Sequence, residues 1–226
     1  MKLTYYGHAC FSVKVAGKDL LFDPFIRHNP LASAIDVDSI PADYILVSHG
    51  HADHLSEAVE IAKRTGATVI SNYEVCEWLG KQGAPKLHHL NHGGSARLDF
   101  GRVKYVWAVH SSSLPDGSNG GNPGGFVVET GEGNFYYSGD TALTGDMKLI
   151  GETTPLRFAV FPIGDTFTMG VDDAVKAADF VRVNKVVGVH YDTFPPIAIN
   201  KGEAAQKFKA AGKELVLVKI GGSVEL

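Results

Sequence analysis

The segment ILVSHGHADHL, residues 45–55, constrains the fold of this chain more than any other. An apolar run of strand length ends at Ser48, and a strand that leads into a helix has no structural need for the polar cluster that follows. In an extended or looped backbone, side chains two residues apart point the same way, so two histidines at i and i+2 can face one ion. Within six positions the segment offers four potential metal ligands, His49, His51, Asp53 and His54.

The second half of this cluster is directed elsewhere. Asp53 and His54 lie at the expected turn into a helix, on a different side of the loop from His49 and His51. Two groups of ligands directed to two places are the arrangement that a pair of metal ions requires. Because the ligands are imidazoles and carboxylates without thiolate, the expected ions are Zn²⁺, Mn²⁺ or Fe²⁺, with zinc the commonest.

Further ligands for a dinuclear site are expected at the ends of other strands. His110 ends the apolar run VKYVWAVH, Asp140 follows NFYYSG, and His190 ends VVGVH. A single histidine at a strand end is more often a hydrogen-bonded residue without a further role. The shared position of these three residues at strand ends favours a common site.

The motif His-x-His-x-Asp-His, followed by a lone strand-end histidine, a GDT aspartate and a final strand-end histidine, resembles the metallo-β-lactamase superfamily. The resemblance extends over essentially the whole chain, in the order of the family. The stretches GHACF, Asp23–Pro24, YYSGDT and PIGDTFTMGVDDA also resemble its small metal-dependent hydrolases, some of which are related to sugar-phosphate lactonases.

This resemblance implies an α/β fold, a four-layer αββα sandwich of two mixed sheets flanked by helices. It also implies two divalent metal ions at one edge, between the sheets. The implied ligands are His49, His51 and His110 for the first ion, Asp53, His54 and His190 for the second, and Asp140 as the bridge between them.

The pattern of apolar and turn residues favours the same architecture. Short strands dominate the first quarter and the middle of the chain. After each of these two regions, strands alternate with helices. This order favours two facing sheets with helices outside. Residues 55–64 carry one apolar helical face, and Gly66 is placed to end that helix. No linker divides the chain, so one domain over residues 1–226 is expected.

Two divalent ions lower the pKa of a shared water and polarise the electrophilic oxygen of a substrate. The expected reaction is therefore hydrolysis of a small ester, lactone, amide or phosphoester. Asp53 is predicted to hydrogen-bond the nucleophile as well as bind metal, and His8, in YGHAC, to act near the site. Asp23 is predicted to orient a ligand by hydrogen bonding. No GxSxG motif indicates a serine nucleophile.

The remaining polar clusters have other interpretations. His28 is expected in a solvated loop. The segment 111–126, rich in Gly, Ser, Asn and Pro, follows a predicted ligand and is expected to cover the substrate. Asp165 stands where the related hydrolases are expected to have glycine. This departure bears on the expected substrate chemistry more than on the expected metal site. Three further histidines are interpreted as surface residues without a carboxylate partner: His88, His89 and His92.

Other functions of the same fold are weaker alternatives. The net charge of −4 and the pI of about 6.2 give no support to a nucleic-acid partner, which disfavours a nuclease or phosphodiesterase of the tRNA-processing kind. A di-iron redox relative generally carries a carboxylate where His51 stands and needs a flavin partner domain. A non-enzymatic metal-binding protein is expected to have lost one or more of the seven ligands. A small-molecule substrate is therefore the expected partner.

The two cysteines, Cys10 and Cys76, are far apart in sequence and are predicted to be buried thiols in a reducing compartment. The N-terminus lacks the features of a signal peptide, and no apolar stretch reaches the roughly 18 residues that a membrane span needs. A cytoplasmic location is therefore expected. The sequence does not determine the oligomeric state, and a homo-oligomer is compatible with it.

Overall fold

The computed structural model describes residues 1–226 and contains two seven-stranded sheets. The strands of the first sheet follow the order β14-β1-β2-β3-β4-β5-β6. Its first members pair antiparallel, whereas β3, β4, β5 and β6 are parallel neighbours. The bounds are Lys2–Gly7 (β1), Cys10–Val15 (β2), Lys18–Phe22 (β3), Tyr44–Leu46 (β4), Thr68–Asn72 (β5), Leu87–Leu90 (β6) and Ser223–Glu225 (β14).

The second sheet has the order β13-β12-β11-β10-β9-β8-β7. Here β7, β8, β9 and β10 pair antiparallel, and β10 to β13 are parallel. Both sheets are therefore mixed. The bounds are Ser95–Leu98 (β7), Gly101–Trp107 (β8), Gly124–Thr130 (β9), Gly133–Tyr137 (β10), Phe158–Pro162 (β11), Lys185–Val189 (β12) and Glu214–Val216 (β13).

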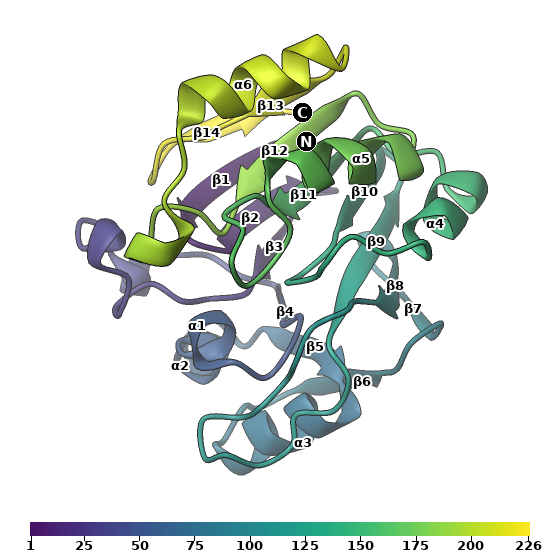
Figure 1. Ribbon diagram of the computed structural model, residues 1–226. Helices are drawn as coiled ribbons and strands as arrows, with labels where there is room; N and C mark the ends of the chain where they lie inside the picture. The colour runs from purple at the N-terminus through teal and green to yellow at the C-terminus, as the bar shows by residue number, and fades with distance from the viewer.

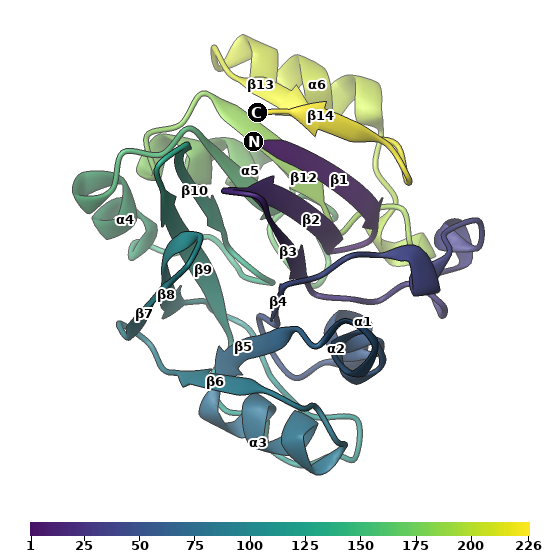
Figure 2. The same ribbon diagram turned by 180° about the vertical axis from the view of Figure 1, so that it is seen from behind.

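Helices cover the outer faces of the two sheets (Figures 1 and 2), which confirms the predicted αββα sandwich. The first three α-helices lie by the first sheet and the last three by the second. No helix is long and apolar enough to span a membrane. The bounds are Ala52–Leu55 (α1), Ala58–Thr65 (α2), Tyr73–Lys81 (α3), Met147–Thr153 (α4), Val171–Phe180 (α5) and Lys201–Ala210 (α6), with 3₁₀ turns at Pro30–Ala32 (η1), Val37–Ser39 (η2) and Pro195–Ile197 (η3).

Three buried apolar clusters hold these layers together. The largest lies between the sheets, where Phe22 of β3 contacts Phe126 of β9 and Phe135 of β10 at ring-centroid distances of 6.2 and 5.9 Å. The other two lie between each sheet and its helices. Each fully buried phenylalanine contributes roughly 1.5–3 kcal/mol, so the facing sheets form a rigid support for the loops at their edges.

The helix predicted over residues 55–64 is divided into two, and the prediction of one continuous helix is wrong. The break lies at Glu57, which is buried although its sequence position suggests a solvated first turn. Its carboxylate accepts a hydrogen bond from the backbone N–H of Ile26 at 2.7 Å, and its own N–H donates to the carbonyl of Pro24. These contacts to a distant loop replace the helical hydrogen bonds. Gly66 ends α2 in the left-handed conformation, as predicted.

Candidate metal centre

The predicted ligands come from segments that meet at one edge of the sandwich. His49 follows β4, His110 follows β8, and His190 follows β12. Asp140 follows β10, while Asp53 and His54 lie in α1, directly after the His49 loop. His8 comes from the tight turn between β1 and β2. The structure thus brings together residues from both sheets that are up to 182 positions apart in the sequence.

Asp140 lies at the centre of the cluster and is buried. Its Oδ2 atom is 3.0 Å from Nε2 of His190, 3.2 Å from Nε2 of His54 and 3.7 Å from Nε2 of His110. Its other carboxylate oxygen, Oδ1, is buried without a hydrogen-bond partner. One carboxylate therefore contacts histidines from three separate segments.

One side of the cluster consists of His49, His51 and His110, whose candidate donor atoms all lie within 4.8 Å of one another. His49 Nε2 and His51 Nδ1 are 2.9 Å apart, and the ring of His110 lies 5.1 Å from each of the other two rings. His49 is fully buried, whereas His51 and His110 are partly exposed. This side of the cluster opens to solvent through His51 and His110.

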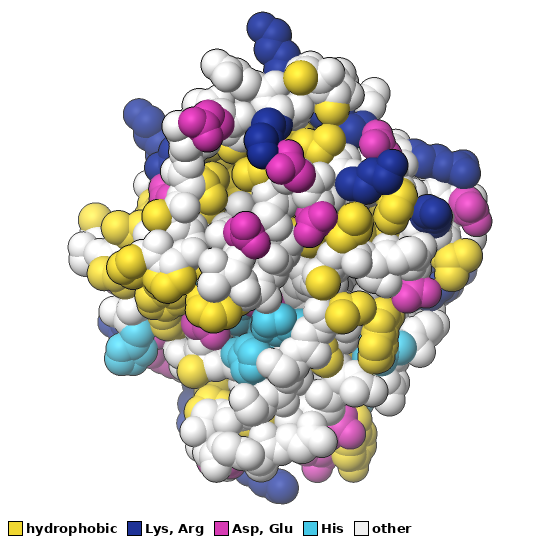
Figure 3. All heavy atoms as spheres, viewed as in Figure 1, with side chains coloured by type: hydrophobic (Ala, Val, Ile, Leu, Met, Phe, Trp, Pro, Cys, Tyr) yellow, Lys and Arg dark blue, Asp and Glu magenta, His cyan; other side chains and the backbone are white.

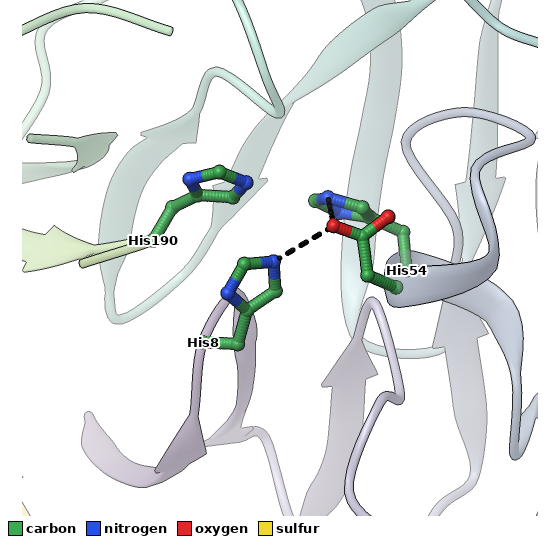
Figure 4. Close-up of side chains that lie close together, drawn as sticks. His8, His54 and His190 are labelled. Atoms are coloured by element: carbon green, nitrogen blue, oxygen red, sulfur yellow. Dashed lines mark hydrogen bonds and ion pairs between the residues drawn. The ribbon is translucent and has the colours of Figure 1, made fainter. Parts of the chain in front are cut away.

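The other side consists of His8, Asp53, His54 and His190, whose candidate donor atoms also lie within 4.8 Å of one another. Figure 4 shows His8 and His190 side by side, facing His54. His8 Nε2 is 3.1 Å from Asp53 Oδ2, and its Nδ1 is 2.9 Å from Thr193 Oγ1. Both ring nitrogens of His8 are thus engaged, one of them by a predicted metal ligand.

Asp23 is completely buried beneath the cluster and accepts four hydrogen bonds. The backbone N–H and the hydroxyl of Ser48 donate to its two oxygens at 2.7 and 2.6 Å. His54 Nδ1 donates at 2.8 Å, and the hydroxyl of Tyr137 donates at 2.5 Å. Asp23 therefore fixes the ring orientation of His54 and ties the end of β4 to β10. The sequence pointed to Asp23 but not to Ser48 or Tyr137, since a serine after a strand and a tyrosine within one carry no distinguishing signal.

Burial lowers the pKa of most histidines in the cluster. It is the main cause of the pKa of His49 lying well below its ordinary value, and the neighbouring His54 adds to the effect. Burial, followed by the nearby His190, lowers the pKa of His8 to about 4. The pKa values of His51 and His110 are lowered chiefly by burial as well. Neutral imidazoles, the form that binds metal, are therefore favoured at these positions.

His54 and the carboxylates behave in the opposite way. Burial acts to lower the pKa of His54, but Asp140, Asp23 and Asp53 outweigh it and hold that pKa well above its ordinary value. Burial acts to raise the pKa of Asp140, but His190 and His54 outweigh it and hold that pKa well below its usual range. The cluster therefore concentrates negative charge around His54 Nε2.

Divalent metal ions fit this set of donors. Two buried atoms of the predicted ligands, His54 Nε2 and Asp140 Oδ1, have no hydrogen-bond partner. His54 Nε2 lies 3.2 Å from Asp140 Oδ2 as an ion pair without a hydrogen bond of good geometry, and leaving such an atom unsatisfied costs about 1–3 kcal/mol. A cation satisfies both and also offsets the charge of the three carboxylates. The imidazole and carboxylate donors match the preferences of Zn²⁺, Mn²⁺ and Fe²⁺.

Three residues of the cluster have left-handed backbone conformations although they are not glycines. The φ angles are 54° at His8, 42° at Asp23 and 54° at His190. Such residues cost on the order of 1–3 kcal/mol each and cluster at functional sites. Asp165 has φ of 62° as well, a conformation that glycine adopts at less cost than a residue with a side chain.

Gly139 positions Asp140 and tolerates no side chain. Its φ is 62°, and a Cβ would lie 2.5 Å from the carbonyl oxygen of Gly124 and 2.8 Å from Ser48 Cβ. We expect Gly139→Ala to lower the free energy of unfolding by about 2–4 kcal/mol and to reduce metal content. Denaturant unfolding and metal analysis measure the two effects. Gly145→Ala is the matched control, because its Cβ meets nothing within 4 Å; equal stability of both variants would contradict the expectation.

The prediction of one loop over residues 111–126 is wrong at its last three residues, 124–126, which begin β9, and the loop that precedes them is anchored to the fold on one side of the cluster. The hydroxyl of Ser112 accepts a hydrogen bond from Gly50 N–H at 3.0 Å, and Asn72 Nδ2 donates to the carbonyl of Gly120 at 2.8 Å. Leu114 is buried among the residues that pack under the first sheet. The loop thereby supports the turn that carries the histidine motif. That it covers the substrate stays a prediction.

The other histidines lie outside the cluster, and one detail of their prediction is wrong. His28 is exposed, as expected. His89 does have a carboxylate partner, because its Nε2 lies 2.9 Å from Glu77 Oε1, and this surface pair joins β6 to α3. His92 Nε2 instead lies 2.9 Å from the carbonyl of Pro123. None of these three belongs to a group of candidate metal donors.

Both cysteines are buried and unpaired, which confirms their predicted form. Burial raises the pKa of the Cys76 thiol to about 12 and that of the Cys10 thiol well above its usual range. Neither thiol is activated as a nucleophile. The cysteines therefore provide no candidate nucleophile for a hydrolytic reaction at the cluster.

An αββα sandwich with a histidine–aspartate cluster at the edge between its sheets defines a hydrolase of the metallo-β-lactamase fold. Residues 18–191 match the family model described as the Beta-lactamase superfamily domain. The chain belongs to this superfamily and is a metal-dependent hydrolase.

Relatives of known sequence and structure agree with this assignment. A protein of Flavobacterium johnsoniae named UPF0173 metal-dependent hydrolase is 52% identical over 226 residues, and a protein of Methylacidiphilum infernorum with the same name is 50% identical. Each match covers 100% of both chains. The solved structure of Igni18, a novel metallo hydrolase from Ignicoccus hospitalis, is 35% identical with a TM-score of 0.89, covering 99% of this chain and 97% of Igni18.

Proposed function

We propose that the chain, as one domain over residues 1–226, hydrolyses a small ester, lactone or phosphoester at a dinuclear metal centre. The observation that carries the proposal is the contact of Asp140 Oδ2 with three histidine Nε2 atoms within 3.7 Å, together with its unpartnered second oxygen. In this proposal His49, His51 and His110 would hold one ion, Asp53, His54 and His190 would hold the second, and Asp140 would be shared between them.

The proposed mechanism assigns separate tasks to the residues around the substrate. Divalent ions held by these residues would supply Lewis acidity, which lowers the pKa of a water and polarises a substrate oxygen. Asp53, whose side chain is 31% exposed, accepts a hydrogen bond from the entering water and orients it, whereas Asp140 is nearly inaccessible at 4%. His8 holds Asp53 in place through its Nε2 atom, because Thr193 fixes the His8 ring at the other nitrogen, Nδ1.

Zinc is the proposed ion, because imidazole and carboxylate donors suit it and it has no redox chemistry. Nothing in the cluster favours the alternatives of a nuclease or of a metal-binding protein without activity. The histidine and carboxylate groups are all present, and their closest charged neighbours are one another. We propose a small-molecule substrate on these grounds.

Removal of metal is expected to abolish hydrolysis of bis(4-nitrophenyl) phosphate and of simple lactones. Dialysis against EDTA should reduce turnover to the buffer rate, and added Zn²⁺ should restore it. Because a ligand that binds only the folded state stabilises by about 3–4 kcal/mol at a large excess over its Kd, the metal-free protein should melt at a temperature lower by roughly 6–16 °C.

The control for this experiment is His89→Ala, which removes an exposed histidine outside the cluster. We expect this variant to keep its metal content and its response to EDTA. Turnover that persists in EDTA, with metal analysis showing a metal-free protein, would rule out the proposed mechanism.

A further inference from the structure

Hydrophobic side chains lie beside the histidine cluster on the surface of the molecule. Figure 3 shows a group of His side chains at the centre of this face with hydrophobic side chains on either side, and the Lys and Arg side chains lie further out. We name as the apolar rim the residues Phe25, Phe167, Phe194, Pro195 and Pro196.

Two members of the apolar rim pack directly on the cluster. The rings of Phe25 and Phe194 each lie 5.5 Å from the ring of His8, edge to face, and 6.4 Å from each other. Phe25 is buried, whereas Phe194 is partly exposed and the two prolines after it are exposed. Because His8 also contacts Asp53, the ring of Phe194 is linked to a predicted ligand through His8.

Phe167 extends this surface from the second sheet. Its side chain is 56% exposed, and it lies in the loop between β11 and α5. The neighbouring Thr166 donates a hydrogen bond to the carbonyl of Pro196 at 2.8 Å, and Met169 N–H donates to the carbonyl of Thr141 at 2.9 Å. The loop is therefore fixed both to the apolar rim and to the segment that carries Asp140.

The charges at the cluster do not suit a phosphorylated substrate. Proteins bind phosphate groups chiefly with Arg and Lys, but the strongest charge influences on His8, His54 and Asp140 all come from other histidines and aspartates. Three carboxylates already offset most of the positive charge that two divalent ions bring. A neutral substrate group therefore fits this cluster better than an anion.

We infer that the substrate is a neutral carboxyl ester or lactone whose apolar acyl chain lies along Phe194 and Phe167. This inference rests on the proposed hydrolytic function and narrows its substrate class. In the reaction, the oxygen of water bonds to the acyl carbon and the acyl C–O bond breaks. The leaving oxygen takes one proton of that water. The products are an alcohol and a carboxylic acid from an ester, or one hydroxy acid from a lactone, and the carboxylic acid group loses its own proton to solvent.

The test compares chelator-sensitive hydrolysis of 4-nitrophenyl hexanoate and 4-nitrophenyl acetate by the zinc-loaded protein. We expect kcat/KM for the hexanoate to exceed that for the acetate by about tenfold or more. Phe194→Ala and Phe167→Ala should each remove most of this preference, chiefly by lowering kcat/KM for the hexanoate. Phe194→Leu should retain most of the preference, since it keeps an apolar side chain.

Tyr73→Ala is the matched control, because Tyr73 is an equally exposed aromatic residue, at 55%, on α3 outside the apolar rim. A second readout is binding of the neutral analogue hexanamide, followed by NMR, which should weaken about tenfold in Phe194→Ala but not in Tyr73→Ala. This readout requires no turnover, so it also tests the inference if the proposed function fails.

Three results separate the two proposals. In the first, hydrolysis depends on metal but favours the acetate, bis(4-nitrophenyl) phosphate or a phosphorylated lactone, and the Phe194 and Phe167 variants do not change this preference. This result overturns the inference and leaves the proposed function standing. Hexanamide binding without metal-dependent hydrolysis supports the apolar rim and overturns the proposed function. Absence of hexanamide binding overturns the inference directly.

Discussion

Asp140→Asn is expected to reduce hydrolysis by about 10³-fold and to lower the metal content from two ions to about one per chain. The asparagine has nearly the same shape, so the fold should persist, but it removes the charge that faces His54, His110 and His190 within 3.7 Å. Elemental analysis of the purified variant and its kcat/KM for a lactone measure the two effects.

The matched control is Asp165→Asn. Both aspartates follow a glycine and precede a threonine, but Asp165 Oδ1 only accepts a hydrogen bond from the backbone of Thr166. Asparagine also tolerates the left-handed conformation found there. The control should keep the full metal content. If Asp140→Asn retained two ions and normal turnover, Asp140 would have no place in the centre.

Asp23→Asn is expected to lower both the stability of the fold and its affinity for metal. The carboxylate accepts hydrogen bonds from Ser48, His54 and Tyr137, and an amide group cannot accept all of them. The buried donors left without an acceptor should lower the free energy of unfolding by about 3 kcal/mol. For a chain of this length, the melting temperature should fall by roughly 6–12 °C.

Metal affinity should fall as well, by about 10–100-fold, because Asp23 orients the ring of His54. Tyr137→Phe provides the comparison, since it removes one of the four hydrogen bonds and should cost only about 1 kcal/mol. Thermal unfolding of the zinc-loaded and EDTA-treated variants measures both effects. An Asp23→Asn protein as stable as Tyr137→Phe would show that Asp23 is not the centre of this network.

The sequence was sufficient to predict which parts of the chain meet at the cluster. His49 and His51 are two residues apart after an apolar strand, and this spacing directs both side chains to the same side. His110 and His190 follow other strands, and a sandwich gathers strand ends at one edge. These signals are local, so they are readable without knowledge of the fold.

The hydrogen bonds around the cluster were not readable in the same way. Tyr137 reaches Asp23 across 114 positions of sequence, and its hydroxyl looks like that of any core tyrosine. In the sequence Thr193 has no feature that distinguishes it from other loop residues, and only the fold brings its hydroxyl against His8. The break in the predicted helix at Glu57 likewise depends on the loop at Ile26. Contacts of this kind depend on tertiary packing, which has no local sequence pattern.

Diffraction from crystals of the zinc-loaded protein, recorded at the zinc absorption edge, would show the number and position of the ions directly. We predict two anomalous peaks on either side of Asp140. One should lie beside His49, His51 and His110, and the other beside Asp53, His54 and His190. A single peak, or peaks away from Asp140, would contradict a dinuclear centre at this edge of the sandwich.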